Sequence, residues 1–416
     1  MGQAVDVIES SAPTVLESAS IAECCAASTA AKIESGAERV ALGRSTGRIL
    51  AEDVRAPFAF PPFVSSAMDG FAVRAGDCQP GAKLRLIGES RAGIALDREL
   101  SAGTAAAIST GAPLPPGADA VVPREDAAAS DGVVSVLGPV AAGAFVRPAA
   151  RYAAAGDLMI AAGTRIGVGE LTALAAFGLA SVECSRRPVV TVLTGGDELV
   201  APGQRRDSAG AYDCNAAMLA AILEGAGASV TTAVYDADDH AIVTALVAEA
   251  ADASDIVVSC GGISAGRHDH VAMALDQLRG EVRVAGTAAR PGRRFVLASL
   301  TRDDGEVPVF ALPGNPLSAF VCAVLYVRRC VLASLGAPPP PRNHALLSSS
   351  IAPDPVLHKL MPARLRRDCL VATVEPVELG SDAAVSLSGC DTLAIIPPGP
   401  GASPSGTQIE CEAIDG

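Results

Sequence analysis

The sequence contains very few aromatic residues. Aromatic side chains make up 3% of its 416 residues and tryptophan is absent, so the cores must be built from Ala, Val, Leu and Ile. Proteins that hold single-stranded nucleic acid stack the bases on aromatic rings. The formal net charge of −14 also disfavours a phosphate-backbone partner, since that binding depends on clustered Lys and Arg. We therefore expect no nucleic-acid partner.

The sequence also lacks a secretory signal and a long apolar run. No Lys or Arg precedes Lys32, so the basic region of a signal peptide is missing. The best apolar run, residues 319–327, ends at Arg328 and Arg329 and is shorter than the roughly 18 residues that cross a bilayer. We expect a cytoplasmic protein with no membrane partner.

Regularly spaced cysteine pairs are missing as well. The chain has 11 cysteines, but none forms a C-x-x-C pair, and only Cys24 and Cys25 are adjacent. Disulfide scaffolds and zinc ribbons space their cysteines differently. We expect mostly reduced thiols that are buried as small apolar groups.

The remaining composition is that of a folded protein with several domains, because half of the residues are apolar and only 19% are charged. Residues 57–150 alternate short β-type runs with Gly- and Pro-rich turns, which suits a small β-domain. Helices are expected within residues 13–33 and at 168–177. After a proline run at 338–341, short β-type segments indicate a second β-domain.

From residue 187, strands and helices alternate along the chain. This alternation is typical of a mostly parallel sheet that is covered by helices on both faces. The segment between residues 278 and 295 is expected to be a loop. The expected strands are 188–193, 229–235, 255–259, 295–300 and 307–312, and the expected helices are 216–224, 239–251, 270–278 and 316–334.

Three glycine-containing loops follow predicted strands of this region. They read TGGDE at 194–198, SCGGIS at 259–264 and LPGNP at 312–316. The carboxyl edge of an open α/β sheet is where ligands bind, and glycine lets backbone N–H groups approach a phosphate. A single Gly-Gly turn is usually only a turn, but three loops at one edge predict a binding site.

Carboxylates lie close to these loops in the sequence. Converging carboxylates beside phosphates suit Mg²⁺, which binds a few hard oxygens and keeps water. The alternative is solvated charge or helix capping, and Asp238 or Asp239 would serve as an N-cap. Zinc is a weak alternative at the histidines, because no further Cys or His cluster accompanies them. The residues are Asp197, Glu198, Asp238, Asp239 and Asp269, with His268 and His270 beside Asp269.

The most compact basic cluster is the segment RPGRR at 290–294. Three guanidiniums around a Pro-Gly turn suit a phosphate or another oxyanion. The alternative is a solvated hairpin tip. No Ser-His-Asp triad, Walker A sequence or G-x-G-x-x-G motif accompanies the cluster.

Five motifs together resemble the molybdopterin molybdenumtransferases, which are the MoeA proteins and the gephyrin E domain. The motifs are SAMDGFA at 66–72, TGAP at 110–113, TGGDEL at 194–199, SCGGISAG at 259–266 and LPGNP at 312–316. The resemblance implies an elongated, L-shaped subunit of mixed α/β and β class with four domains. They are a discontinuous domain I (12–56 and 151–184), a small mixed β-domain II (57–150), a MogA-like α/β molybdopterin-binding domain III (185–336) and a C-terminal β-barrel domain IV (337–416).

The resemblance also implies a reaction and its partners. Mg²⁺-assisted cleavage of adenylylated molybdopterin would release AMP while molybdenum from molybdate enters the dithiolene. A homodimer with the site at the subunit interface is implied, with contacts to molybdopterin adenylyltransferase and molybdoenzymes. The alternatives are a catalytically impaired molybdopterin-binding or scaffolding paralogue and a molybdopterin adenylyltransferase.

The resemblance assigns roles residue by residue. The catalytic positions are Asp69, acting from the partner subunit, with Glu198 and Asp269. The metal positions are Asp238 or Asp239, together with Asp269. The substrate-binding positions are Thr110, Asp157, Gly195, Gly196, Asp197, Gly261, Gly262, Ser264, Arg290, Arg293, Arg294, Pro313, Gly314, Asn315, Arg364 and Ser386.

The chain departs from the family pattern on the anion side of the expected site. Family members usually read Lys-Pro-Gly-Lys-Pro where this chain has RPGRR, and Asp-Tyr-x-Lys where it has DHVA at 269–272. The Asn that often precedes the SAMDG motif is replaced, giving VSS at 64–66. Arg keeps the charge of Lys but presents a planar fork. These changes would alter the geometry in which the site holds molybdate and phosphate, which is why a paralogue with lowered or altered activity is one of the alternatives.

Overall fold

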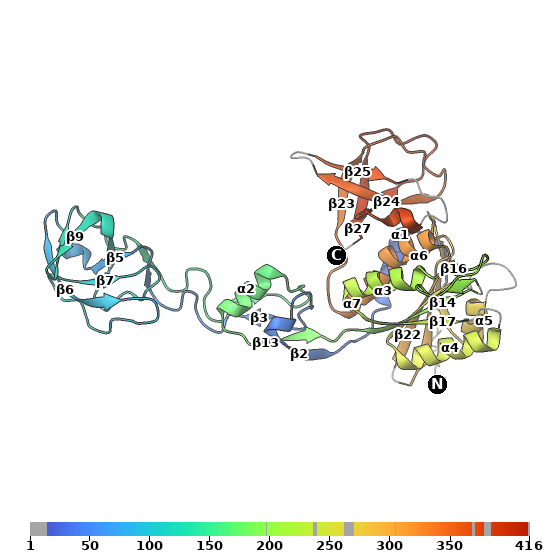
Figure 1. Cartoon of the computed structure of the whole chain (residues 1–416), viewed down its shortest axis with the longest axis horizontal. Helices are drawn as coiled ribbons and strands as arrows, with labels where there is room; N and C mark the ends of the chain where they lie inside the picture. The colour runs from blue at the N-terminus through green and yellow to red at the C-terminus, as the bar shows by residue number, and fades with distance from the viewer. Residues whose placement is uncertain are drawn as a thin grey trace, which may run out of the picture. The chain divides into compact units, whose positions relative to one another are not determined.

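The computed structural model describes residues 15–196, 198–235, 239–261, 270–303, 305–367, 371–377 and 384–414. The chain forms two compact units, coloured by residue number in Figure 1. The larger unit contains residues 1–52, 162–167 and 181–416, and the smaller unit contains residues 53–161 and 168–180. Both units contain segments that are distant in sequence, and each is described by itself below.

A seven-stranded sheet forms the centre of the larger unit, in the order β1-β19-β21-β22-β18-β14-β17. Strand β14 runs parallel to both β17 and β18, and β18 runs parallel to β22. Only β21 is antiparallel to its neighbours, so the expected mostly parallel sheet is confirmed. The strands are β1 Leu16–Ala19, β14 Val189–Gly195, β17 Ser229–Tyr235, β18 Ile256–Cys260, β19 Glu281–Thr287, β21 Val296–Arg302 and β22 Gly305–Leu312.

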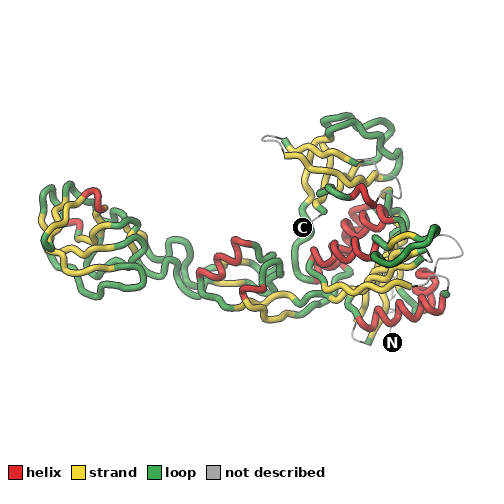
Figure 2. The backbone as a smooth tube through the Cα atoms, in the orientation of Figure 1, coloured by secondary structure: helices red, strands yellow, loops and turns green. Residues whose placement is uncertain are grey.

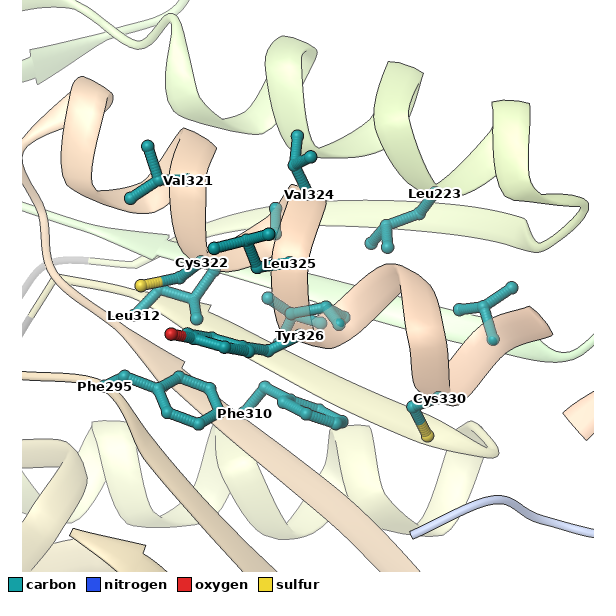
Figure 3. Packing of buried hydrophobic residues seen from close by; sticks show 14 of the residues in the cluster. Leu223, Phe295, Phe310, Leu312, Val321, Cys322, Val324, Leu325, Tyr326 and Cys330 are labelled. Atoms are coloured by element: carbon teal, nitrogen blue, oxygen red, sulfur yellow. The ribbon is translucent and has the colours of Figure 1, made fainter. Parts of the chain in front are cut away.

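Helices cover both faces of this sheet, as the alternating pattern predicts (Figure 1). One face carries α1 (Ile21–Ala30), α3 (Asn215–Ala226) and a long C-terminal helix, and the other carries α4 (His240–Ala253) and α5 (His270–Gln277). Figure 3 shows the first of these cores, where aromatic rings meet aliphatic side chains. The rings of Phe295 and Tyr326 lie 4.6 Å apart in this core.

The long helix consists of α6 (Pro316–Cys322), a π-helical segment η4 (Ala323–Val327) and α7 (Arg328–Ser334). By length and composition it could cross a membrane, which corrects the expectation that no apolar run is long enough. Nearly all of it is buried inside the larger unit. The two arginines expected to end the apolar run are themselves buried and pair with Glu412, so this is a core helix.

A closed five-stranded barrel follows, in which β26 returns to pair with β24. A short strand, β20 (Ala289–Arg290), runs parallel to β24 and places Arg290 opposite Lys359. The arginine loop is therefore attached directly to the barrel. The barrel strands are β23 Arg342–Leu347, β24 His358–Arg367, β25 Ala372–Pro376, β26 Thr392–Ile396 and β27 Gln408–Ala413, with a short helix η5 at Ala384–Leu387.

Short pairings complete the larger unit. Strand β2 (Ala37–Ala41), followed by η1 (Leu42–Arg44), pairs antiparallel with β13 (Ser181–Ser185). Strand β15 (Leu199–Val200) runs parallel to β16 (Ala211–Tyr212). All ten cysteines among the described residues have free thiols, as expected.

The smaller unit consists mostly of strands and loops (Figure 2). Its six-stranded sheet has the order β8-β5-β7-β6-β10-β9, which confirms a small mixed β-fold. Helix α2 (Val168–Ala176) leads to Phe177, whose ring lies 5.3 Å from that of Phe58. The remaining elements are β3 Val54–Arg55, β4 Ser65–Ser66, β5 Gly70–Val73, η2 Ala75–Asp77, β6 Lys83–Ser90, β7 Thr104–Ile108, β8 Ala120–Pro123, η3 Arg124–Asp126, β9 Ala127–Ser130, β10 Val133–Val136, β11 Val146–Arg147 and β12 Leu158–Ile160.

Two segments differ from the sequence expectations. Residues 281–287, expected to be a loop, form strand β19, and residues 16–19, expected to lie in a helical segment, form β1. The two strands pair with each other in parallel, and β19 also pairs with β21. Their structure is therefore stabilised by pairing between distant parts of the chain. The division into four domains stays a prediction.

Candidate functional site

The three glycine loops meet at the carboxyl edge of the seven-stranded sheet. A Cβ added at Gly261 would lie 2.7 Å from the carbonyl oxygen of Gly195, and one added at Gly314 would lie 3.3 Å from the Cα of Gly261. The N–H of Gly261 donates a hydrogen bond to the carbonyl of Leu312 at 3.1 Å. The described parts of the loops therefore pack backbone against backbone, as three loops at one edge predict.

Replacing Gly261 with alanine should destabilise this junction. Gly261 has φ of +97°, a conformation that L side chains rarely adopt, and its Cβ would meet the Gly195 carbonyl. We expect Gly261→Ala to lower the free energy of unfolding by about 2 kcal/mol. Urea unfolding measures this change. Gly225→Ala is the control, because Gly225 lies in helix α3 with open space at the Cβ position. Equal effects of the two substitutions would contradict the prediction.

Helix α3 begins beside this junction with two buried polar residues. The hydroxyl of Thr194 donates to Asp213 Oδ2 at 2.7 Å, and Asp213 Oδ1 accepts from the N–H of Ala216 at 3.0 Å. Asn215 Nδ2 donates to the carbonyl of Gly314 at 2.8 Å. The sequence analysis missed Asp213 and Asn215. The available signal was their position directly before a predicted helix.

Tyr235 contacts the junction from the end of β17. A Cβ at Gly195 would lie 2.1 Å from the Tyr235 ring, so glycine is needed for this contact. Burial raises the pKa of Tyr235 to about 12. The residue is 4% exposed, and its buried hydroxyl has no hydrogen-bond partner among the described residues. At neutral pH it is a protonated group that can donate to a ligand.

Two of the predicted carboxylates lie among the described residues of this edge. The carboxylate of Glu198 folds over Gly196, since a Cβ there would lie 2.7 Å from Oε2. Asp239 caps α4, with Oδ1 accepting from the N–H groups of Ala241 and Ile242 at 2.8 and 3.4 Å. The capping alternative is thus confirmed for Asp239, and its metal role stays a prediction.

Several predicted positions fall outside the described residues: Asp197, Asp238, Gly262, Ser264 and Asp269. Within the described ranges, no group of three or more His, Cys, Asp or Glu could hold a metal. The rings of His240 and His270 stack with centroids 6.3 Å apart. The zinc alternative therefore gains no support from the described side chains.

A cavity of about 1300 Å³ lies between the arginine loop and the barrel. Neither Arg290 nor Arg293 has an ion pair or hydrogen bond from its side chain within the part of the chain that the structure describes. All three arginines are exposed at the edge of the cavity, so a role in anion binding stays a prediction beside the alternative of a solvated loop. Lining residues from the loop are Arg290, Pro291, Gly292, Arg293 and Arg294, those from the LPGNP segment include Pro313 and Asn315, and those from the barrel include Asp354 and Lys359.

Close packing holds the arginine loop in place. Gly292 has φ of +105°, and a Cβ there would lie 2.9 Å from the sulfur of Cys322 in α6. The N–H of Thr287 donates to the carbonyl of Arg293 at 3.0 Å. The loop is thus fixed against the core helix on one side and the barrel on the other. Arg293 and Arg294 also line a second cavity of about 590 Å³ beside α5.

Asp354 is an acidic residue among those that line the large cavity. Its Oδ1 accepts hydrogen bonds from the N–H groups of Val356 and Leu357, both at 3.0 Å. These two bonds, and then the positive charges of Arg290 and Arg293, lower the pKa of Asp354. The carboxylate remains charged at neutral pH and offsets part of the arginine charge.

The smaller unit brings Asp69 and Thr110 together. Asp69 Oδ1 accepts from the Thr110 N–H at 2.7 Å and from its hydroxyl at 2.9 Å, and these bonds lower the pKa of Asp69. Asp157 Oδ2 accepts from the N–H of Ala154 at 2.8 Å, which closes a turn. The functional roles of the three residues stay predictions.

Arg364 and Ser386 belong to the barrel. Arg364 Nε lies 3.6 Å from the Cβ position of Gly389, in the turn that follows η5. Ser386 is in η5 itself, so the two residues lie around one turn. The lining of the large cavity includes neither of them.

The fold and the cavity define an α/β protein with an attached barrel and an arginine-lined cavity. Two family models match the chain: "MoeA N-terminal region (domain I and II)" over residues 9–178 and "Probable molybdopterin binding domain" over residues 191–332. The molybdopterin molybdenumtransferase 2 of Mycobacterium tuberculosis is 34% identical over 327 residues, which cover 75% of this chain and 79% of that protein.

A second curated relative and a solved structure also match most of this chain. The molybdopterin molybdenumtransferase of Nostoc sp. is 33% identical over 304 residues, covering 72% of this chain and 69% of that protein. The crystal structure of the molybdopterin biosynthesis MoeA protein from Pyrococcus horikosii has a TM-score of 0.82 at 30% identity, covering 97% of this chain and 100% of that one. This chain belongs to the molybdopterin molybdenumtransferases, a family of transferases in molybdenum cofactor biosynthesis.

Proposed function

We propose that this protein inserts molybdenum from molybdate into adenylylated molybdopterin and releases AMP. The observation that carries the proposal is the cavity lined by Arg290, Arg293 and Arg294. Molybdate is a tetrahedral dianion, and a planar guanidinium fork donates two parallel hydrogen bonds to such an oxyanion. The side chains of Arg290 and Arg293, which have no ion pair with any described residue, are available for this contact.

The glycine junction supports binding of the larger substrate at the adjacent sheet edge. Backbone N–H groups at such an edge can face phosphate oxygens, and the hydroxyl of Tyr235 adds a donor beside Gly195. Glu198 lies next to the same loop, with its carboxylate over Gly196. We assign it to the surroundings of the reacting phosphate.

Mg²⁺ belongs to the proposal through its carboxylate ligands. The capping bonds of Asp239 use Oδ1, and Oδ2 has no hydrogen bond among the described residues, so a hard oxygen ligand is available. Asp238 and Asp269 are the other proposed ligands. When bound, Mg²⁺ would neutralise charge on the phosphates that are cleaved. The homodimer, with Asp69 acting from the partner subunit, and contacts with other cofactor-biosynthesis proteins are further parts of the proposal.

A turnover experiment tests the function. Purified full-length protein is mixed with adenylylated molybdopterin, molybdate and Mg²⁺, and AMP is measured by chromatography. We expect AMP release with all three components and loss of release when EDTA removes Mg²⁺. Tight molybdopterin binding without AMP would instead indicate a non-catalytic paralogue. ATP consumption in the presence of molybdopterin would indicate an adenylyltransferase.

A further inference from the structure

Asn215 carries a buried acceptor that no described residue uses. The residue is 7% exposed at the first position of α3, and its Nδ2 donates to the Gly314 carbonyl at 2.8 Å. Its Oδ1 is buried and has no hydrogen-bond partner among the described residues. Since the Gly314 carbonyl can only accept, the amide NH₂ must face Gly314, and Oδ1 must face away from it. The position of the unpaired oxygen is thereby fixed.

No structural hydrogen bond within the described part of the chain uses this oxygen. The start of α3 is already capped, because Asp213 Oδ1 accepts from the N–H of Ala216. Anchoring Gly314 requires only the NH₂ half of the amide. A buried acceptor without a donor is unfavourable, and in native proteins such a group calls for an explanation.

We propose that Asn215 is a substrate-binding residue whose Oδ1 accepts a hydrogen bond from an N–H or O–H group of the bound substrate. This inference rests on the proposed function for the identity of that substrate. Gly314, which Asn215 holds, packs against Gly261, and Gly261 packs against Gly195. The unpaired Oδ1 therefore belongs to the same junction as the three glycine loops.

The acceptor also determines which part of the substrate it can bind. Phosphate and molybdate oxygens are themselves acceptors at neutral pH and would be repelled by Oδ1. The pterin ring carries N–H groups, and the ribose of the adenylyl group carries O–H groups. Asn215 would thus orient the uncharged part of the substrate, while Arg290 and Arg293 bind the oxyanion. The hydroxyl of Tyr235 beside Gly195 likewise has no partner among the described residues, which is a second buried polar group available to a ligand at this junction.

Calorimetric titration of the full-length chain tests the proposal. The probes are AMP, dideoxy-AMP, which lacks both ribose hydroxyls, and a reduced tetrahydropterin. We expect Asn215→Ala to weaken binding of either AMP or the pterin by about tenfold. If the ribose is the donor, removing its hydroxyls weakens binding to the wild type but not to the variant. If the pterin is the donor, only the pterin binds the variant more weakly.

The control is Asn343→Ala, which removes an exposed Asn from β23 and should leave both affinities unchanged. Asn215→Ser repeats the titrations with a residue that suits a helix start, should the alanine variant not fold. Affinities within twofold of wild type for both probes would overturn the proposal. So would an equal loss for both probes together with a lowered melting temperature, since that indicates a structural role. A wild-type protein that binds the probes but releases no AMP would contradict the proposed function alone.

Discussion

Replacing Glu412 with alanine is expected to lower the free energy of unfolding by about 3–5 kcal/mol, because it leaves buried arginines without a counter-charge. Glu412 is 0% exposed in strand β27. Its Oε1 accepts from Arg328 Nη2 at 2.9 Å, and its Oε2 accepts from Arg329. Arg342 Nε lies 3.7 Å from Oε2. Removing the carboxylate would leave the buried guanidinium groups of Arg328 and Arg329 without a counter-charge and without access to water.

Glu410→Ala provides a matched control on the same strand. Glu410 accepts from Arg342 at 2.8 Å, but its side chain is 44% exposed. An exposed pair of this kind contributes less than about 1 kcal/mol. Urea unfolding of both variants, followed by circular dichroism, gives the comparison. Similar shifts for Glu412→Ala and Glu410→Ala would show that the buried cluster does not stabilise the larger unit.

The same cluster has a consequence for the cavity. Arg328 and Arg329 belong to the long core helix, whereas Glu412 belongs to the barrel. The arginine loop packs on that helix through Gly292, and Asp354 and Lys359 come from the barrel. The buried ion pairs therefore connect the core helix and the barrel, which both contribute lining residues to the arginine-lined cavity.

The inner strands of the central sheet could be predicted from the sequence because they are buried on both faces. Such strands read as apolar runs, as in the IVVSC sequence of β18, whose expected and observed bounds differ by one residue at each end. Helices alternate with these runs and end near glycines. Strand β17 has the bounds that the pattern predicts. In this region the apolar runs in the sequence coincide with the strands of the sheet, so the prediction is accurate.

Strand β19 could not be predicted in the same way. Its sequence EVRVAGT mixes charged and apolar residues, and its alternation is interrupted by a register shift beside β21. Its parallel partner β1 has only four residues, and Ser18 within it has φ of 50°. The pairing that stabilises both strands joins segments far apart in sequence. Periodicity within a short window contains no information about such pairing.

In the candidate site, too, local sequence patterns predicted some residues, whereas residues brought in by long-range packing were missed. Glycine pairs after strands predicted the junction of Gly195, Gly261 and Gly314, because strand ends of a parallel sheet share one edge. Asn215 was missed because its role depends on Gly314, which lies 99 residues away. Asp354 faces the arginines only because the barrel folds beside their loop. The sequence motifs identify the loops of the site. Which polar side chains lie next to those loops depends on the tertiary structure.

The arginine loop should give the largest loss of activity. A charge-assisted hydrogen bond contributes about 1.5–3 kcal/mol, which corresponds to roughly 10- to 100-fold in affinity. We therefore expect Arg290→Ala or Arg293→Ala to raise the molybdate concentration for half-maximal AMP release by that factor. The double variant should raise it by about 1,000-fold. Because neither side chain has an ion pair among the described residues, removing them should not lower the melting temperature.

Lysine variants separate the charge of these residues from their shape. Arg290→Lys and Arg293→Lys restore the side chain that the family usually has at these positions. They keep the charge and lose the planar fork, so we expect them to retain activity within about tenfold of wild type. Arg39→Ala is the control, because Arg39 is 75% exposed and pairs only with Glu183 in the larger unit's described part. If alanine at position 290 or 293 leaves the molybdate dependence unchanged, the cavity is not the molybdate site. If lysine fails as completely as alanine, the planar fork is essential and charge alone is not sufficient for oxyanion binding.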